Sequence, residues 1–369
     1  MAWTAEPRRA ADGGGLRYPP DRTDAEWALV APMIRLAMHG VRQLLSLGMG
    51  RDHQALRHHT GRGALLALLL VLSSCASDIQ QAPVGAQAGM SDAGPPAPSN
   101  PARDYVVATW NVAWATRRSD TIPPTAREFV RSPATWRRTQ DFAIGLGADI
   151  VALQEVDGVP IARLLLPPSA GFGGWRTTAT DGPNETQRVV LVTRSGIPVQ
   201  VQPDVSSIGG GFLRSGLDST IMLDARPLRV LVLHLKAFCN RGQLTPTPPS
   251  GDCEQLARQV PHIVAWIEAR RAEGTAYMVL GDFNRELGES GDEVWRAFRQ
   301  ADPELRLIQQ RETGNCPAGN GGIDNILLGG PAAGWVVAGS QRGIPLPAPS
   351  GAIGLLSDHC PLRLTLRPR

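Results

Sequence analysis

Acidic, amide and imidazole side chains follow several short apolar runs from Tyr105 onward. They are Asn111, Glu155, His234, Asp282, Asn284, Asp324, Asp358 and His359. Carboxylate and amide oxygens select hard cations such as Mg²⁺, Mn²⁺ or Ca²⁺, whereas paired histidines can transfer protons. One polar residue at the end of a strand is usually a turn former. So many in one domain, without a nucleophile-elbow serine or a Cys-x-x-Cys pair, favour a site that combines a hard cation with proton transfer.

Short β-rich runs alternate with helical patterns in the same part of the chain, and they must position these side chains. Strands are predicted at 105–109, 149–153, 189–193, 228–234 and 277–280. A helix is predicted at 258–271, because apolar residues recur at helical spacing, Pro261 falls in its first turns and Gly274 follows its end. Helices that flank mostly antiparallel sheets indicate an α/β sandwich.

Six motifs follow one another along residues 104–365. They are Thr109-Trp110-Asn111-Val112, Asp149-Ile150-Val151-Ala152-Leu153-Gln154-Glu155-Val156, Leu233-His234-Leu235-Lys236, Gly281-Asp282-Phe283-Asn284, Gly322-Ile323-Asp324-Asn325-Ile326-Leu327 and Ser357-Asp358-His359-Cys360-Pro361-Leu362. In type and order they resemble the endonuclease/exonuclease/phosphatase superfamily, typified by pancreatic deoxyribonuclease. The resemblance implies an α+β domain at 104–369, a four-layered α/β/β/α sandwich of two mainly antiparallel sheets flanked by helices, as in deoxyribonuclease I.

The resemblance also implies a metal site. A phosphodiester carries charge on its non-bridging oxygens and has a poor leaving group, so its hydrolysis needs charge neutralisation and a hydroxide at neutral pH. Glu155 matches the family's principal metal ligand, and we expect Asn111 and Asp358 beside it. These residues would hold Mg²⁺, or Mn²⁺ or Ca²⁺, as a Lewis acid against a phosphate oxygen.

The remaining motif residues are expected to be catalytic. By resemblance, His359 is oriented by Asp324 and would polarise the attacking water or steady the phosphate. Asp282 and Asn284 would position the nucleophile and bind phosphate oxygens. His234 would bind phosphate or protonate the leaving oxygen.

Two basic residues are candidates for substrate contact. Lys236, next but one to His234, is the only lysine among 37 basic residues. Arg188 precedes a predicted strand, although a surface arginine is the alternative reading. Many family members support the central histidine with a carboxylate or tyrosine, which should fall here between Gly171 and Arg194. That stretch leaves the partner of His234 open among Asp181, Glu185, Gln187 and Arg188. Trp110 and Trp114 could stack a base, but aromatic residues of this kind are more often part of the core.

The charge pattern bears on the substrate. Of the formal charge of +3, residues 1–75 hold nine Arg against six Asp plus Glu, so residues 76–369 carry 28 of each sign. Binding of bulk nucleic acid usually needs a basic excess. We expect a monomeric phosphodiesterase or nuclease, with a sphingomyelinase-like enzyme, an inositol-phosphate-type phosphatase and a catalytically silent binding lipoprotein as alternatives. No aromatic loop for membrane insertion is identified, and a silent module would have lost metal or histidine residues that are all present.

The N-terminal region predicts export. Residues 64–72 form an apolar run that is too short to span a bilayer, with Arg57 and Arg62 before it and Leu72-Ser73-Ser74-Cys75 at its end. This end resembles a bacterial lipobox, so residues 49–75 are interpreted as a lipoprotein signal peptide with Cys75 as the lipidated residue. A buried helix ending in an ordinary cysteine is the alternative. The protein would then be anchored to the periplasmic side of a bacterial membrane.

Segments on either side of this signal complete the domain plan. Residues 76–103 are rich in Ala, Pro, Gly, Gln and Ser and are interpreted as a flexible tether. Residues 1–48 include a stretch at 18–32 that resembles the start of insertion-sequence transposases. They are interpreted as a fused leader, or as the product of a misassigned start with translation beginning at Met49.

Four cysteines remain once Cys75 is set aside. Export permits disulfides, and three pairings are formally open. Cys239 and Cys253 bracket a Pro/Gly-rich loop, and Cys316 and Cys360 lie near Asp324 and His359, which the resemblance brings together. We therefore expect Cys239–Cys253 and Cys316–Cys360. Zinc binding is the alternative, disfavoured because no Cys-x-x-Cys spacing exists.

Overall fold

A computed structural model describes residues 103–178, 186–211, 213–246, 250–309 and 322–369. The predicted leader at 1–48, the signal peptide with Cys75 and all but the last residue of the tether lie outside the described residues. Asp181, Glu185 and Cys316 lie outside them as well. Among the helices that are described, none has the length and apolar character needed to cross a membrane.

The first sheet has the spatial order β11-β12-β1-β2-β4-β3. Its strands are β1 (Tyr105–Ala115), β2 (Ile150–Val156), β3 (Phe172–Thr177), β4 (Arg188–Arg194), β11 (Arg342–Gly343) and β12 (Leu362–Leu366). The second sheet has the order β5-β6-β7-β8-β10-β9. Its strands are β5 (Val199–Val201), β6 (Leu217–Leu223), β7 (Arg226–His234), β8 (Tyr277–Asp282), β9 (Arg306–Gln309) and β10 (Asp324–Gly329).

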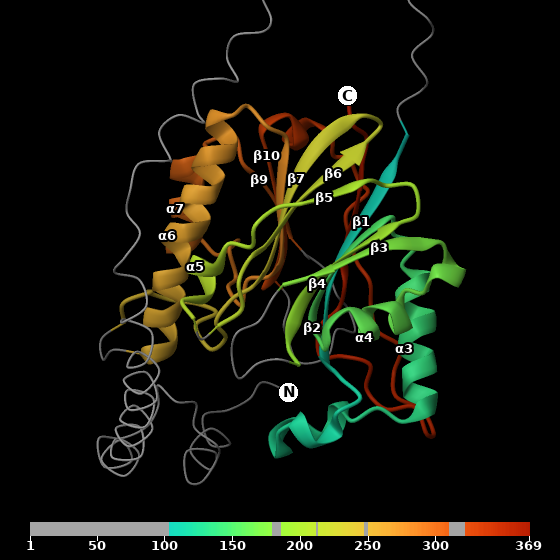
Figure 1. The fold of residues 1–369 in the computed structure, drawn as a ribbon. Coiled ribbons are helices and arrows are strands. Elements are labelled where there is room, and N and C mark those ends of the chain that lie inside the picture. The colour runs from blue at the N-terminus through green and yellow to red at the C-terminus, as the bar shows by residue number, and fades with distance from the viewer. Residues whose placement is uncertain (1–102, 179–185, 212, 247–249, 310–321) are drawn as a thin grey trace, which may run out of the picture. The chain divides into compact units, whose positions relative to one another are not determined.

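Helices cover the outer faces of both sheets. The α-helices are α3 (Pro133–Gly145), α4 (Gly158–Leu165), α5 (Ser206–Gly209), α6 (Gly251–Ala272) and α7 (Glu293–Ala301). The 3-10 helices are η2 (Ser119–Thr121), η3 (Pro124–Phe129), η4 (Pro168–Ala170) and η6 (Gly330–Gly334). In Figure 1, α3 and α4 lie on the side of β2 and β4, and α6 and α7 lie on the opposite side.

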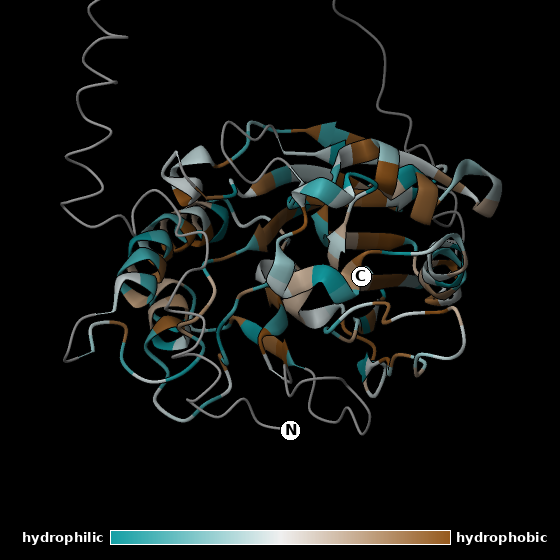
Figure 2. Ribbon diagram, turned by 90° about the horizontal axis from the view of Figure 1, so that it is seen from below, coloured by the Kyte–Doolittle hydropathy of each residue, from teal (hydrophilic) through white to brown (hydrophobic). Residues whose placement is uncertain are grey.

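Strand periodicity explains the layers. In β7, Leu228, Val230 and Val232 pack into the core between the sheets, while Leu231 and Leu233 face α6 and α7. In β1, Val107 faces the other sheet and Trp110 faces the α3 side. Successive side chains of a strand point to opposite faces, so a strand buried on both faces is apolar throughout. Figure 2 shows these brown strands between teal-faced helices. The expected four-layered α/β/β/α sandwich is confirmed.

Each sheet contains one central parallel pair, and these pairs position the functional residues. β1 runs parallel to β2, and β7 runs parallel to β8, while the other pairings are antiparallel. Parallel strands have their carboxyl ends at the same edge of a sheet. Asn111 is therefore opposite Gln154, next to Glu155, and His234 is opposite Asp282.

Some element boundaries differ from the sequence expectation. The helix predicted at 258–271 begins at Gly251, because Ser250 caps its first turn by accepting a hydrogen bond from the Cys253 amide at 3.5 Å. Pro261 therefore lies inside the helix instead of in its first turns. Asp324 is the first residue of β10 and does not follow a strand; it reaches the same edge because β10 runs antiparallel to β8.

The cysteine expectation is confirmed in part. Cys239 and Cys253 form the expected disulfide, which excludes zinc binding by these two residues. Cys360 is also disulfide-bonded. The expected pairing with Cys316 falls on a residue outside the described part of the chain.

Candidate active site

Asn111 and Glu155 meet at the ends of the parallel pair β1 and β2. The Asn111 amide Nδ2 donates to Glu155 Oε1 at 3.2 Å and to Asp282 Oδ2 at 3.0 Å, which links the two sheets. The Trp114 backbone N–H donates to Glu155 Oε2 at 3.0 Å. Both oxygens of the Glu155 carboxylate are thus oriented by hydrogen bonds from the first sheet.

This edge of the molecule has an unusual backbone. Ala113, Trp114, Glu155 and Asn284 have φ values of 51°, 50°, 58° and 48°. The left-handed region is unfavourable for residues other than glycine, and such residues cluster at functional sites. The turn at Ala113 and Trp114 aims the Trp114 N–H at Glu155, so the strained geometry has a direct use here.

Arg131 holds that turn in place. The residue is 8% exposed, and its guanidinium donates to the carbonyl oxygens of Val112, Ala113, Trp114, Phe129 and Leu356. Burial lowers the Arg131 pKa to about 10, although the nearby Glu155 and Asp358 carboxylates counteract this shift. Since Leu356 comes just before the Ser-Asp-His motif, Arg131 joins the loop that follows Asn111 to the loop that carries His359.

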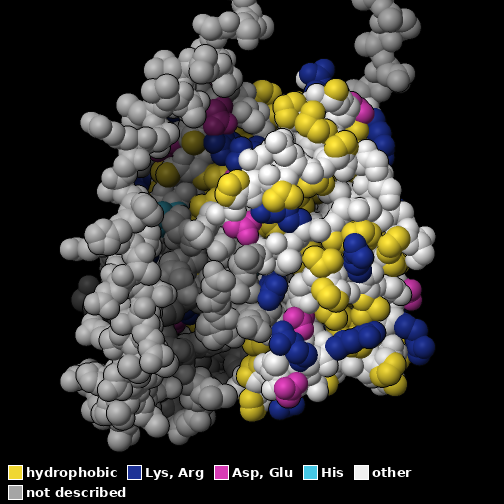
Figure 3. All heavy atoms as spheres, in the orientation of Figure 1, with side chains coloured by type: hydrophobic (Ala, Val, Ile, Leu, Met, Phe, Trp, Pro, Cys, Tyr) yellow, Lys and Arg dark blue, Asp and Glu magenta, His cyan; other side chains and the backbone are white. Residues whose placement is uncertain are grey.

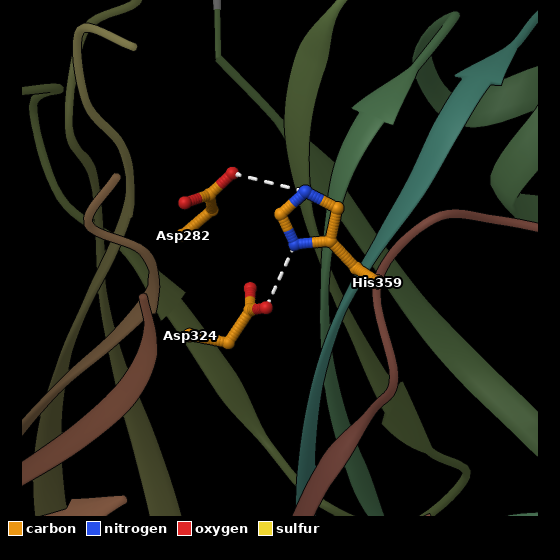
Figure 4. A group of neighbouring side chains, drawn as sticks. All are labelled: Asp282, Asp324 and His359. Carbon is orange, nitrogen blue, oxygen red and sulfur yellow. Dashed lines mark hydrogen bonds and ion pairs between the residues drawn. The ribbon is translucent and has the colours of Figure 1, made fainter. Parts of the chain in front are cut away.

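His359 lies between two carboxylates from the second sheet, as Figure 4 shows. Its Nδ1 is hydrogen-bonded to Asp324 Oδ2 at 2.7 Å, and its Nε2 is 3.9 Å from Asp282 Oδ2. Burial opposes protonation of the ring, but Asp324 and Asp282 outweigh it and raise the His359 pKa well above its usual range. For Asp282, burial above all raises the pKa to about 6, with His359 acting in the opposite direction.

His234 approaches the same carboxylate from β7. Its Nε2 is 3.6 Å from Asp282 Oδ2 and 3.8 Å from Glu155 Oε1. Burial, together with the positive charges of Arg214 and His359, holds the His234 pKa well below its usual value. Its buried Nδ1 has no hydrogen-bond partner among the described residues. Of the four partners left open, Asp181 and Glu185 are not among those residues.

The residues expected to bind metal form a group that suits a hard cation. Glu155 lies next to the Asn111 amide, and its pKa is raised by burial and by the negative charge of Asp358. Two carboxylates that repel each other are a ligand pair that Mg²⁺ or Ca²⁺ would neutralise. The Asn111 amide oxygen, the ligand atom expected there, accepts a hydrogen bond from the Ala113 N–H at 3.0 Å, and the amide nitrogen faces Glu155. Asp282, Asp324 and His359 also offer ligand atoms within 4.8 Å of one another. Because His359 and Asp324 are already hydrogen-bonded, this trio is better suited to proton transfer.

Other predicted residues lie around this centre. The Asn284 backbone N–H donates to Asp282 Oδ1 at 2.8 Å, and its side chain donates to the Leu235 carbonyl oxygen at 3.0 Å. Lys236 Nζ is 2.5 Å from Asp252 Oδ1, in the first turn of α6. Arg188 is paired in register with Val156 and helps Arg118 and Thr116 to lower the Asp157 pKa against the effect of burial.

Two functional residues escaped the sequence reasoning. Arg131 sits in an irregular segment without a motif, and so does Arg214, whose guanidinium is buried and donates to the carbonyl oxygens of His234 and Leu235 at 3.3 Å. Conversely, Trp110 is fully buried and its Nε1 donates to the His359 carbonyl oxygen at 2.9 Å, so it is a core residue and cannot stack a base.

Comparisons with known proteins identify structures of similar fold. The human Nocturnin catalytic domain with bound sulfate anion is similar at 17% identity and a TM-score of 0.51, over 71% of this chain and 92% of that one. D. rerio TDP2 complexed with single strand DNA product is similar at 14% identity and a TM-score of 0.50, over 71% and 98%. TDP2 from Caenorhabditis elegans is similar at 12% identity and a TM-score of 0.50, over 72% of this chain and 74% of that one. No curated protein matches the chain.

At these identities the solved structures establish the fold alone. A family model supplies the remaining evidence, because the model of the Endonuclease/Exonuclease/phosphatase family matches residues 108–359. This range covers well over half of the chain and includes every motif residue from Asn111 to His359. The chain therefore belongs to the Endonuclease/Exonuclease/phosphatase family.

Proposed function

We propose that this family member, one of a group that hydrolyses phosphate esters, is a phosphodiesterase that requires a hard divalent cation and acts on nucleic acid. The observation that carries the proposal is the convergence of three side chains on Asp282 Oδ2. Asn111 Nδ2, His234 Nε2 and His359 Nε2 lie 3.0, 3.6 and 3.9 Å from that oxygen. Two imidazoles around a buried carboxylate form a proton-transfer centre.

The protonation states favour distinct roles for these groups. Because Asp324 and Asp282 raise its pKa well above the usual range against the effect of burial, His359 favours its protonated form, which can stabilise negative charge on the phosphate. Asp282, with its pKa raised to about 6, can accept a proton from the attacking water. His234 is neutral because of its lowered pKa, so it suits hydrogen bonding to a phosphate oxygen better than protonation of the leaving oxygen.

Glu155, Asn111 and Asp358 would hold the cation in this proposal. A bound Mg²⁺ supplies Lewis acidity at a phosphate oxygen. The residues of the chain supply the rest: Asn111 connects Glu155 to Asp282, and Arg131 fixes the loops that carry these groups.

Neighbours of this fold support the substrate class. Their structures contain a single strand DNA product in D. rerio TDP2 and a sulfate anion in human Nocturnin. On the face drawn in Figure 3, basic side chains lie interspersed with hydrophobic and acidic ones, and residues 76–369 carry 28 charged residues of each sign. This distribution of charge fits a substrate that is bound mainly near the scissile phosphate better than one that is bound along an extended basic surface.

The test is a substrate panel with the full-length chain, with Mg²⁺ or with EDTA. We expect hydrolysis of single-stranded DNA or RNA, little turnover of sphingomyelin or inositol phosphates, and loss of activity in EDTA. Glu155→Gln should lower kcat on the order of 10²-fold or more, because the cation's charge stabilisation is worth several kcal/mol. The matched control is Glu268→Gln, which removes an exposed carboxylate from α6. Undiminished turnover in EDTA would contradict the metal role.

We also propose that the enzyme is exported and anchored through Cys75. The Cys239–Cys253 disulfide supports an oxidising compartment, since disulfides are rare where thiols are kept reduced. The lipobox-like sequence at Leu72-Ser73-Ser74-Cys75 supports a lipid anchor.

A further inference from the structure

Phe238 is the most exposed of the large hydrophobic residues in the described part of the chain. Its exposed fraction is 79%, and its φ of 71° lies in the left-handed region. A bulky residue at positive φ is a real outlier, and such strain persists only where surrounding structure enforces it. An aromatic ring that is exposed to solvent on a strained backbone raises the free energy of the folded state. A binding role at the surface would account for this cost.

The loop that carries Phe238 is fastened on two sides. On one side, the adjacent Cys239 is disulfide-bonded to Cys253 in α6. On the other side, the buried Arg285 donates to the carbonyl oxygens of Cys239 and Gly242, while its Nε pairs with Asp292 at 2.6 Å. The ring is thus presented by a rigid support, which lowers the entropic cost of binding something to it.

The loop lies next to the proposed active site. Phe238 follows His234 by four residues, so the Cα atoms of the two residues are at most roughly 14 Å apart even in a fully extended chain. Arg285, which holds the loop, is the residue after Asn284, and the Glu286 amide donates to the Asn240 carbonyl oxygen at 3.0 Å. The loop therefore lies close enough to the proposed site for one substrate to reach both.

The surroundings of the ring distinguish a planar base from a lipid chain. Lys236 Nζ lies over the ring, 5.1 Å from its centroid, and is paired with Asp252. Asn240 and Arg241, which follow in the same loop, are exposed. One aromatic ring among charged groups is too small an apolar area to anchor a protein in a bilayer, but it is sufficient to stack one nucleobase.

We propose that Phe238 is a stacking platform for a nucleobase next to the scissile phosphate. The inference deepens the proposed function and rests on it for the position of that phosphate. Lys236 covers one face of the ring, which leaves the other face for the base. The chain would thus prefer phosphodiesters that carry a base over those that carry only a sugar or a lipid.

Binding measurements test the platform separately from hydrolysis. The full-length chain with His359→Ala, which should cleave the probe on the order of 10²-fold more slowly than the wild type, is titrated in EDTA into a fluorescein-labelled single-stranded oligonucleotide or into the same strand with tetrahydrofuran abasic residues. Adding Phe238→Ala should weaken binding of the base-bearing strand by about 10-fold, on the scale of a lost base stack. Binding of the abasic strand should change less than about twofold, because stacking needs the base. Phe238→Trp should restore the preference for the base-bearing strand.

A matched control is Val201→Ala, which removes a side chain from another exposed hydrophobic residue, on β5, with an exposed fraction of 65%. It should leave the affinity for both strands unchanged. Equal weakening for base-bearing and abasic strands, or full affinity in Phe238→Leu, would overturn the stacking role. Loss of binding to sphingomyelin vesicles in place of oligonucleotides would assign the ring to a membrane and overturn it too. Turnover of the same strands by the wild-type chain with Mg²⁺ reports on the proposed function independently.

Discussion

Asp324 and His359 come from opposite sheets and meet in one short contact of 2.7 Å. The carboxylate fixes the ring and favours its protonated form, so the catalytic value of Asp324 should be expressed through His359. We expect His359→Ala to lower kcat on the order of 10²-fold or more, the usual scale for a positioned acid or base. Asp324→Asn should lower kcat less, and the double variant should be little slower than His359→Ala alone, because groups that act as a unit are not additive.

Steady-state kinetics of the two single variants and the double variant check this coupling. If Asp324→Asn slowed the reaction as much in the His359→Ala background as in the wild type, the two residues would act independently. The assignment of Asp324 as the residue that orients His359 would then be wrong.

At this scale the motifs identified residues that the fold brings together, while the chemical role of each stays a prediction. Asn111, Glu155, His234, Asp282 and His359 converge as expected, because strand ends in a sandwich share an edge. Arg131, Arg214 and Phe238 could not be predicted in the same way. The role of each depends on which carbonyl oxygens or solvent it meets after folding, and a single residue in an irregular segment leaves no periodic signal.

At the scale of elements, irregular segments between helices and strands determine how accurately the functional side chains are positioned. Arg131 connects the irregular last part of β1 to the loop before β12, so its loss should loosen the ligand set around Glu155. Arg131→Lys keeps the charge but cannot reach all five carbonyl oxygens, because an ammonium group lacks the planar fork of a guanidinium. We expect the Mg²⁺ concentration for half-maximal activity to rise about 10-fold or more, as is typical for residues that support metal ligands.

A titration of activity against Mg²⁺ measures this effect. The control is Arg127→Lys, an exposed arginine of η3 whose Nη1 donates to the Ser119 carbonyl oxygen at 3.3 Å. It should leave the titration unchanged. A wild-type Mg²⁺ requirement in Arg131→Lys would show that the guanidinium serves the fold alone.

The end of β10 allows a test of packing. A Cβ added to Gly329 would lie 2.0 Å from the ring of Tyr277, which is fully buried and donates its O–H to Asp302 at 2.6 Å. The ring cannot move away without breaking that hydrogen bond, so Gly329→Ala should destabilise the domain by roughly 1–3 kcal/mol or more. Urea unfolding measures the change. Gly334→Ala, where the added Cβ meets nothing within 4 Å, should stay within about 0.5 kcal/mol of the wild type.

The sequence predicted elements better than their ends. Every predicted strand exists, because runs of branched apolar residues are buried on both faces of a sheet. The start of α6 was placed too late, since the apolar spacing that indicates the helix begins near Val260 while the cap that starts it is Ser250. Proline is typical of the first turn of a helix, but Pro261 lies inside α6, where it removes one backbone hydrogen bond. Packing of Leu256, Val260 and Ile263 against the second sheet compensates for that loss.

For the whole molecule, the prediction concerns the anchor. If Leu72-Ser73-Ser74-Cys75 is a working lipobox, the mature protein begins at a lipidated Cys75 and partitions with membranes, because a diacylglyceryl anchor holds stably where a single chain does not. Cys75→Ala should leave the precursor uncleaved without impairing catalysis in the folded domain. Intact-mass measurement of the membrane fraction checks this. A soluble cytosolic protein that still begins at Met1 would overturn the proposal.

The left-handed residues at the catalytic edge have a consequence for the evolution and engineering of this enzyme. A left-handed conformation costs roughly 1–2 kcal/mol at a residue with a Cβ, asparagine being the common exception, so Ala113, Trp114 and Glu155 together weigh heavily against a typical folding free energy of about 5–15 kcal/mol. Glycine would relieve the strain at each of these three positions. A directed-evolution campaign that selected for heat resistance alone would therefore accept glycine at Glu155, and it would yield a more stable protein without the proposed metal ligand.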